Sequence, residues 1–133
     1  MRDMAHPVMF DESDPLLARV RTIALALPEA DEKVSHGRPA FFTQKVFIYF
    51  GGSQRIDDEW VAHDAAIMVR PEPDDAPALR QDPRFWVPAY LGPSGWLGLD
   101  LGGDTDWDEI AELVDASYRV TAPRRLVRLM DAG

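Results

Sequence analysis

The chain has no cysteine among its 133 residues. A disulfide, a thiolate nucleophile and a cysteine-bound zinc site are therefore excluded, and a reducing, cytoplasmic setting is the expectation. No stretch approaches the roughly 20 consecutive apolar residues that a membrane helix needs. The first 16 residues, "MRDMAHPVMFDESDPL", also lack the apolar segment of a signal peptide. These absences predict a protein that does not use a membrane.

Positive charge is scarce, because 14 lysines and arginines face 23 acidic residues and leave a net charge of -9. Such a chain repels a polyanion at long range, since nonspecific affinity for nucleic acid comes mainly from cations that displace phosphate counterions. The charged residues are unevenly distributed along the chain. Residues 100–115 hold seven acids and no cation, whereas residues 119–130 hold four arginines and no acid. These arginines could form a local basic surface, or they could only complement the dipoles of helices near their C-termini.

The length and an ordinary hydrophobic content of 46% predict one domain with a real core. Residues 1–12 are expected to form a flexible tail, and residues 13–131 the domain. A first helix is predicted to begin at Pro15 and to end before Pro28. The clearest helical periodicity follows Asp106, and a short last helix is expected from residue 124 to 130.

Between these helices the sequence predicts strands. Residues 40–42, 45–50 and 61–70 are the first three, and a strand pair flanks the Gly92-Pro93 turn. A short helix is expected near residues 74–81, bounded by prolines. Gly51 and Gly52 are predicted to end the second strand, with "SQRIDDEW" as a polar excursion after it. The order predicts an α+β domain in which N- and C-terminal helices flank an antiparallel sheet.

Catalytic and metal-binding patterns are missing. His6, His36 and His63 have no paired ligand spacing, so we expect no metal, and no motif predicts another cofactor. Ser35 and His36 are adjacent, and in an extended segment they would point to opposite faces, which argues against a nucleophile and its base. No serine lies in a G-x-S-x-G elbow. We therefore expect a protein that is not an enzyme.

The segment from His36 to Pro39 is the most distinctive local pattern. Gly37 frees the backbone and Pro39 restricts it, with an imidazole and a guanidinium on either side of the glycine. The turn could present both side chains to an anion. Alternatively, Arg38 pairs with a nearby carboxylate such as Glu32 and only shapes the start of a strand.

Four phrases, taken together, resemble the MmcQ/YjbR family of small bacterial proteins. They are "VSHGRPAFF", "KVFIYFGG", "RFWVPAYLGPSGWLGLDL" and "DWDEIAELVDASYRVTAPRRL", which occur in the family's order over residues 16–129. The resemblance implies a compact α+β fold of the frataxin (CyaY)-like, double-wing type. The sequence departs from a typical member in the acidic stretch "SQRIDDEWVAHDAA", where a shorter polar turn would be expected.

The resemblance also implies DNA binding, a function commonly assigned to the family from its fold. On that hypothesis the phosphate contacts would come from cations spread along the chain, namely Arg38, Lys45, Arg84, Arg124, Arg125 and Arg128. The first alternative is a module that binds or sequesters a small molecule, of the drug-resistance type, with a pocket formed by His36, Arg38, Tyr90 and Trp96. A second alternative is a protein-interaction domain that uses the acids of residues 100–115. A monomer is favoured.

Overall fold

A computed structural model describes residues 8–132 of the chain. The prediction of a tail over residues 1–12 falls mostly outside these residues, and the helical part begins at Pro15. No helix in the described range is long and apolar enough to cross a membrane.

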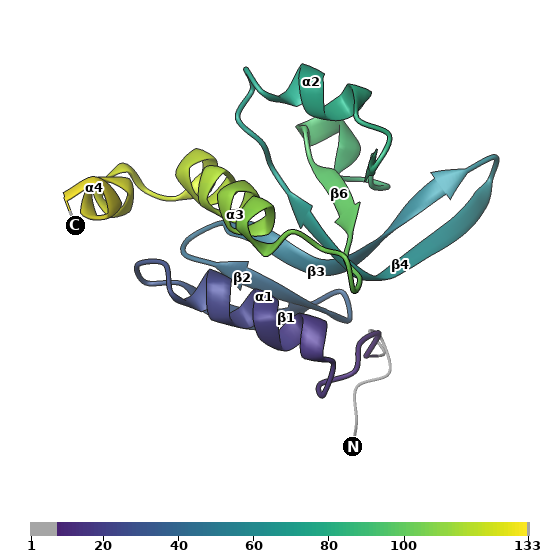
Figure 1. The fold of residues 1–133 in the computed structure, drawn as a ribbon, viewed down its shortest axis with the longest axis horizontal. Helices are drawn as coiled ribbons and strands as arrows, with labels where there is room; N and C mark the ends of the chain where they lie inside the picture. Colours follow the sequence, from purple (N-terminus) through teal and green to yellow (C-terminus); the bar gives the residue numbers. More distant parts are fainter. Residues whose placement is uncertain (1–7, 133) are drawn as a thin grey trace.

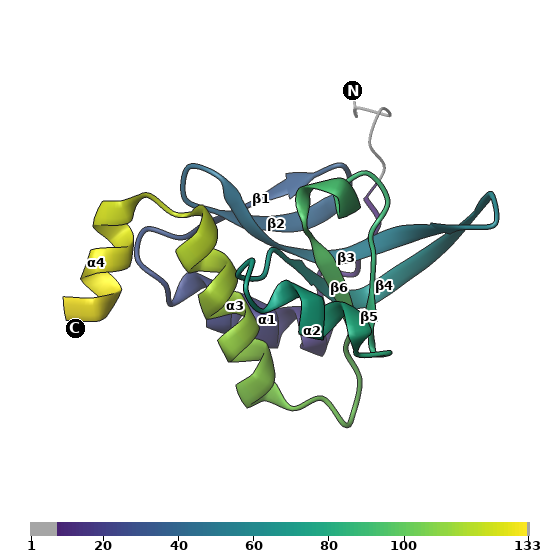
Figure 2. The same ribbon diagram turned by 90° about the horizontal axis from the view of Figure 1, so that it is seen from above.

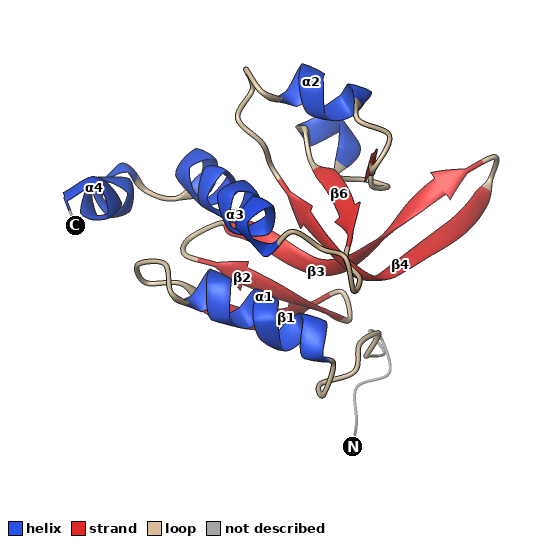
Figure 3. Cartoon of the chain, viewed as in Figure 1, coloured by secondary structure: helices blue, strands red, loops and turns tan. Residues whose placement is uncertain are grey.

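Six antiparallel strands form one sheet, in the order β1-β2-β3-β4-β6-β5 (Figures 1 and 3). The two longest strands, β3 and β4, are paired in its middle. The apolar residues in the first half of β3 and the last part of β4 are largely buried, because both faces of the sheet are covered there. The strand bounds are Asp31–Ser35 for β1, Arg38–Phe42 for β2, Val46–Ile56 for β3, Glu59–Val69 for β4, Phe85–Trp86 for β5 and Leu97–Asp100 for β6.

Three of the four α-helices lie on one face of this sheet, and the C-terminal one lies beyond its end (Figure 2). Helix α1, Pro15–Leu25, begins where the Asp14 side chain accepts a hydrogen bond from the backbone of Leu16. Helix α3, Trp107–Thr121, is capped in the same way by Asp106. Both pack on β3 and enclose the main core, while α2, Ala76–Gln81, and α4, Arg124–Ala132, are shorter and more peripheral. The predicted α+β class and its terminal helices are confirmed.

Two expectations about the strands were wrong. Strand β1 was not predicted, since its sequence "DEKVS" is polar and exposed at the sheet edge. The second strand also does not end at Gly51 and Gly52: β3 continues to Ile56 and pairs with β4 in a hairpin that projects from the domain (Figure 1). A register shift between Phe50 and Gly52 marks a bulge. It is made by Gly51, whose φ of 82° is the left-handed conformation that glycine tolerates best.

One buried hydroxyl links α3 to the sheet. Ser117 is fully buried, donates a hydrogen bond of 2.5 Å to the carbonyl of Phe47 in β3, and accepts one of 2.9 Å from the backbone nitrogen of Arg70. Next to it, Tyr118 donates to the carbonyl of Pro28 at 2.6 Å and packs its ring edge-on against Phe47. These bonds fix α3 across the strands that carry the site described below.

Replacing Ser117 with alanine should lower the free energy of unfolding by about 1–3 kcal/mol, because a buried backbone N–H and a carbonyl each lose their side-chain partner. Chemical denaturation measures this change. Thr22→Ala is the control, since it removes an exposed helical hydroxyl bonded to the Ala18 carbonyl and should change stability by less than about 0.5 kcal/mol. Equal effects of the two substitutions would contradict the anchoring role of Ser117.

Candidate functional site

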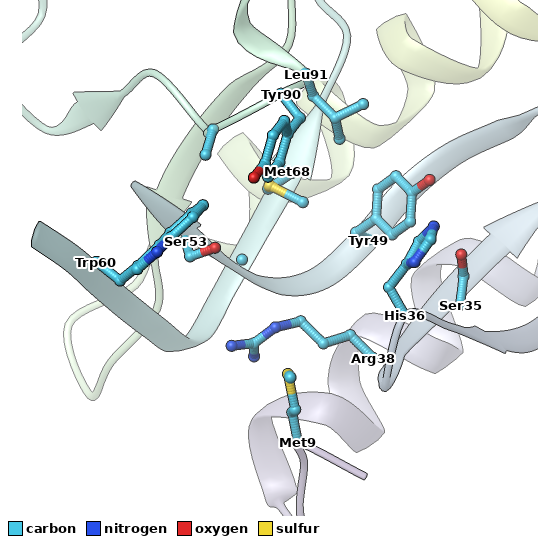
Figure 4. A pocket seen from close by; sticks show the side chains of 12 residues that line it. Met9, Ser35, His36, Arg38, Tyr49, Ser53, Trp60, Met68, Tyr90 and Leu91 are labelled. Atoms are coloured by element: carbon cyan, nitrogen blue, oxygen red, sulfur yellow. The ribbon is translucent and has the colours of Figure 1, made fainter. Parts of the chain in front are cut away.

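A pocket of about 560 Å³ opens on the face of the sheet opposite the helices (Figure 4). Three parts of the chain enclose it: the β1–β2 turn, the β3–β4 hairpin and the segment between β5 and β6. Its lining is mainly aromatic and aliphatic with a few polar groups, formed by Met9, Ser35, His36, Arg38, Tyr49, Gly52, Ser53, Trp60, Met68, Ala89, Tyr90 and Leu91. Such a volume and lining are typical of small-molecule sites.

Aromatic side chains form two sides of the pocket. Trp60 of β4 lies 5.8 Å from Tyr90 between ring centroids, and Arg55 stacks on the same indole at 4.8 Å. Trp60 and Tyr90 are 52% and 84% exposed, so the pair forms an apolar rim open to solvent. On the inner side, Tyr49 packs against Trp96 with centroids 5.5 Å apart. The predicted pocket residue Trp96 therefore supports the wall from behind, while Tyr90 lines the cavity.

Backbone bonds hold the three parts of the pocket together. The amide of Ala89 donates to the carbonyl of Ser53 at 2.9 Å, which attaches the β5–β6 connection to the hairpin. Tyr90 then has a φ of 66°, a left-handed conformation that is uncommon for a large residue. At the other side, the amide of Met9 donates to the carbonyl of Gly37 at 2.9 Å. This bond fixes Met9 beside the pocket, which its side chain lines.

The β1–β2 turn delivers Arg38 to the site. His36 and Gly37 both have positive φ, 54° and 85°, as in the two-residue turns that suit the twist of a hairpin. The Arg38 side chain is only 12% exposed and passes over Gly51, where a Cβ atom would overlap its Nη1. Its Nη2 donates to Oδ1 of Asp64 at 3.1 Å, while Nη1 is buried without a hydrogen-bond partner among the described residues.

Arg38 does pair with a carboxylate, as one of the two alternatives expected, but that carboxylate is not the example Glu32. Glu32 is held instead by Arg21, whose Nε and Nη2 donate to the carboxylate at 2.8–3.0 Å. The partner of Arg38 is the 73% exposed Asp64 of β4. His36 and Arg38 both line the pocket, so the motif shapes the strand and also contributes to a cavity.

Burial and hydrogen bonding determine the protonation state of Tyr49, which lines the pocket. Removal from water raises the pKa of Tyr49 above its ordinary value, and a hydrogen bond with Ser35 acts in the opposite direction. The phenol therefore stays protonated at neutral pH. It offers both a hydrogen-bond donor and an acceptor at this wall.

The six cations predicted to contact DNA differ in whether a carboxylate already pairs with them. Arg84 donates to Glu109 and Asp82, which together raise its pKa, and Arg125 donates to Glu29 at 2.7 and 2.9 Å. Lys45, at the β2–β3 turn, and two α4 residues, Arg124 and Arg128, are exposed and make no ion pair with the described residues. Of the six predicted contacts, three already have carboxylate partners: Arg38, Arg84 and Arg125.

Several acids between residues 100 and 115 also have structural partners. Asp106 caps α3, and Glu109 and Asp115 pair with Arg84 and Arg119. Asp100 accepts from the Trp86 indole at 3.2 Å and contacts Nδ1 of His63 at 2.7 Å. These four acids thus stabilise the fold, including the base of the hairpin. Among residues 8–132 no group of three potential ligands could hold a metal ion.

Sequence reasoning identified His36, Arg38 and Tyr90 but missed much of the pocket. Tyr49, Ser53, Trp60 and Met68 come from β3 and β4. The one available signal in the sequence was Trp60, a large aromatic residue in an otherwise polar stretch that also contains Arg55. It indicates a pocket wall only when β3 and β4 are known to form a hairpin, because only then do Arg55 and Trp60 lie opposite each other.

The comparisons agree with this fold. The YjbR family model matches residues 25–120, and the chain belongs to this family. Its structure resembles the crystal structure of Deinococcus radiodurans protein DR2400, which contains a DUF419 domain. The TM-score is 0.58 at 16% identity, over 81% of this chain and 79% of that one. This likeness concerns the fold alone.

Two curated relatives are also similar in sequence. They are phosphoglycerate kinases from two strains of Campylobacter jejuni, each 30% identical over 96 residues, or 63% of this chain. The chain spans only 24% of the length of these enzymes.

The close approach of Arg38 to Gly51 can be tested with two alanine substitutions. Gly51→Ala and Gly95→Ala should each lower the free energy of unfolding by about 1–2 kcal/mol, because both glycines have positive φ. Only Gly51→Ala should also displace the Arg38 guanidinium, since no atom lies within 4 Å of a Cβ at Gly95. The side-chain ¹H–¹⁵N NMR signal of Arg38 reports the displacement, and an unchanged signal in Gly51→Ala would contradict this packing.

Proposed function

We propose that this YjbR-family protein is a nonenzymatic binding module whose pocket holds a small, largely apolar organic molecule. The observation that carries the proposal is the cavity of about 560 Å³ with aromatic walls, a few polar groups and an exposed aromatic rim. Exposure of the Trp60 and Tyr90 rings to water is unfavourable, so a flat ligand that covers them gains binding free energy. The polar groups would orient the ligand rather than transform it.

Charge favours this function over DNA binding. In a double-wing protein the β3–β4 hairpin would be a wing, yet residues 53–64 hold one cation, Arg55, and four acids, Asp57, Asp58, Glu59 and Asp64, a net charge of -3. Such a strand pair would repel a phosphate backbone. The pairing of Arg84 and Arg125 with carboxylates further reduces the positive charge available.

A pocket-filling substitution tests the proposal. Fragments should quench tryptophan fluorescence and bind in ligand-observed NMR, and Ser53→Phe should weaken this binding by about ten-fold or more, a change of roughly 1.4 kcal/mol. Ser53 lines the pocket from a strand, where phenylalanine is readily accommodated.

Val61→Phe is the matched control. Val61 pairs with Gln54, one residue along the ladder from Ser53, so its side chain points to the other face of the hairpin. It should bind the same fragments as the parent does. Equal binding by Ser53→Phe and the parent, or a screen without a single binder, would refute the proposal.

DNA binding, the function implied by the family resemblance, is testable on the same protein. Fluorescence anisotropy with a labelled duplex at low salt should show no saturation up to high-micromolar protein. Saturable binding with a log–log salt slope near -3.6, the value for about four phosphate contacts, would contradict this expectation. Loss of that binding in Arg124→Gln/Arg128→Gln would then place the contacts on α4.

A further inference from the structure

We infer that the ligand of this pocket is a flat aromatic carboxylate whose acidic group binds Arg38 in place of the carboxylate of Asp64. The inference rests on the proposed binding function and specifies its ligand class. It follows from the charge of the lining, the hydrogen bonding of Arg38 and the exposure of Asp64.

The pocket is a non-acidic site on an acidic protein. Of the described residues that line it, Arg38 is the one with a permanent charge, and none is an aspartate or a glutamate. The chain as a whole carries 23 acids and a net charge of -9. Asp64, which pairs with Arg38, is not among the lining residues, so an anion is favoured over a neutral or cationic ligand where its charge can take the place of that carboxylate.

Arg38 has more donors than its surroundings use. A guanidinium carries five N–H donors and cannot lose its charge in a protein. Here one hydrogen bond links Nη2 to Asp64, while Nη1 is buried without a partner in the described part of the chain. Buried cations are costly unless they are paired and hydrogen-bonded. A carboxylate that takes both nitrogens would complete a bidentate pair, the strongest geometry available to this side chain.

Asp64 shows that a carboxylate fits beside Arg38, and it is easily displaced. Its side chain is 73% exposed and reaches Arg38 through a single bond of 3.1 Å. Water reaches the Asp64 side of this pair, so loss of its single hydrogen bond costs little. The ligand's carboxylate would exchange for another carboxylate, so the charge beside Arg38 stays balanced.

The rest of the cavity favours an aromatic body. Figure 4 shows Arg38 extended toward the Trp60 end of the pocket, with Tyr90 and Met68 on the opposite side of the cavity. Tyr49 forms a further wall. Ring faces and a thioether are good contacts for a planar π-system. A ligand with its carboxylate at Arg38 would place its rings among these side chains.

A pair of matched probes tests the ligand class: naphthalene-2-carboxylate and its uncharged amide, naphthalene-2-carboxamide. Both have the same rings and nearly the same shape. Titrations followed by tryptophan fluorescence at physiological ionic strength should show that the carboxylate binds about ten-fold or more tightly than the amide, as expected for hydrogen bonds to a charged group. Arg38→Gln should abolish this preference.

Asp64→Asn provides the second and sharper test, because it leaves the cavity and Arg38 intact. Removal of the competing carboxylate should tighten binding of naphthalene-2-carboxylate by roughly two- to five-fold, the range of exposed ion pairs, and leave the amide unchanged. Glu59→Gln is the control, since it removes the same charge from the same strand without a contact to Arg38. It should change neither affinity by more than about two-fold, because distant exposed charges are screened.

The outcomes separate the two proposals. Equal binding of the acid and the amide, or equal effects of Asp64→Asn and Glu59→Gln, overturns the carboxylate inference but leaves the pocket's binding function in place. If neither probe nor any other fragment binds, the proposed function fails and the inference fails with it. A preference for the acid that Asp64→Asn increases supports both.

Discussion

The arrangement of the whole pocket depends on how Arg38 packs over Gly51. The bulge at Gly51 lets β3 and β4 continue beyond the body of the sheet, and the lack of a side chain there gives the arginine room to cross. Arg38 in turn reaches Asp64 on β4, so β2 is tied to the hairpin through a side chain as well as through the ladder. A Cβ at position 51 would conflict with both features, because the backbone there has positive φ and the guanidinium lies where the methyl group would be.

This geometry makes a ligand site a better account of the molecule than a nucleic-acid surface. The hairpin that extends from the domain carries acids at its tip, and Trp60, which pairs with Arg55 just inside that tip, faces the pocket. Its tip would repel a phosphate backbone, whereas Trp60 meets Tyr90 from the β5–β6 connection and forms a concave apolar wall with it. Family membership and the likeness to DR2400 agree with the fold and leave the choice of function to the site.

The sequence predicted those elements whose apolar residues are periodic, and failed where both faces of an element meet water. Helix α3 was clear because its apolar stripe and the Asp106 cap are local signals. Strand β1 and the outer part of β3 gave no such signal, since their largely exposed residues have no buried face to produce alternation. The β3–β4 turn at Asp57 and Asp58 was not predicted for another reason. Both residues adopt left-handed φ, which their residue type permits but does not require. Pocket residues such as Met68 and Ser53 are defined by tertiary contacts between three segments, and no local pattern encodes those contacts.

Amide chemical-shift mapping of the full chain, with naphthalene-2-carboxylate in one titration and a DNA duplex in the other, distinguishes the pocket from a DNA-binding surface. We expect saturable shifts with the carboxylate at residues 35–38, 49–53 and 89–91, and none with the duplex at low salt. Saturable shifts with the duplex on α4 and the hairpin, together with a silent pocket, would contradict this expectation.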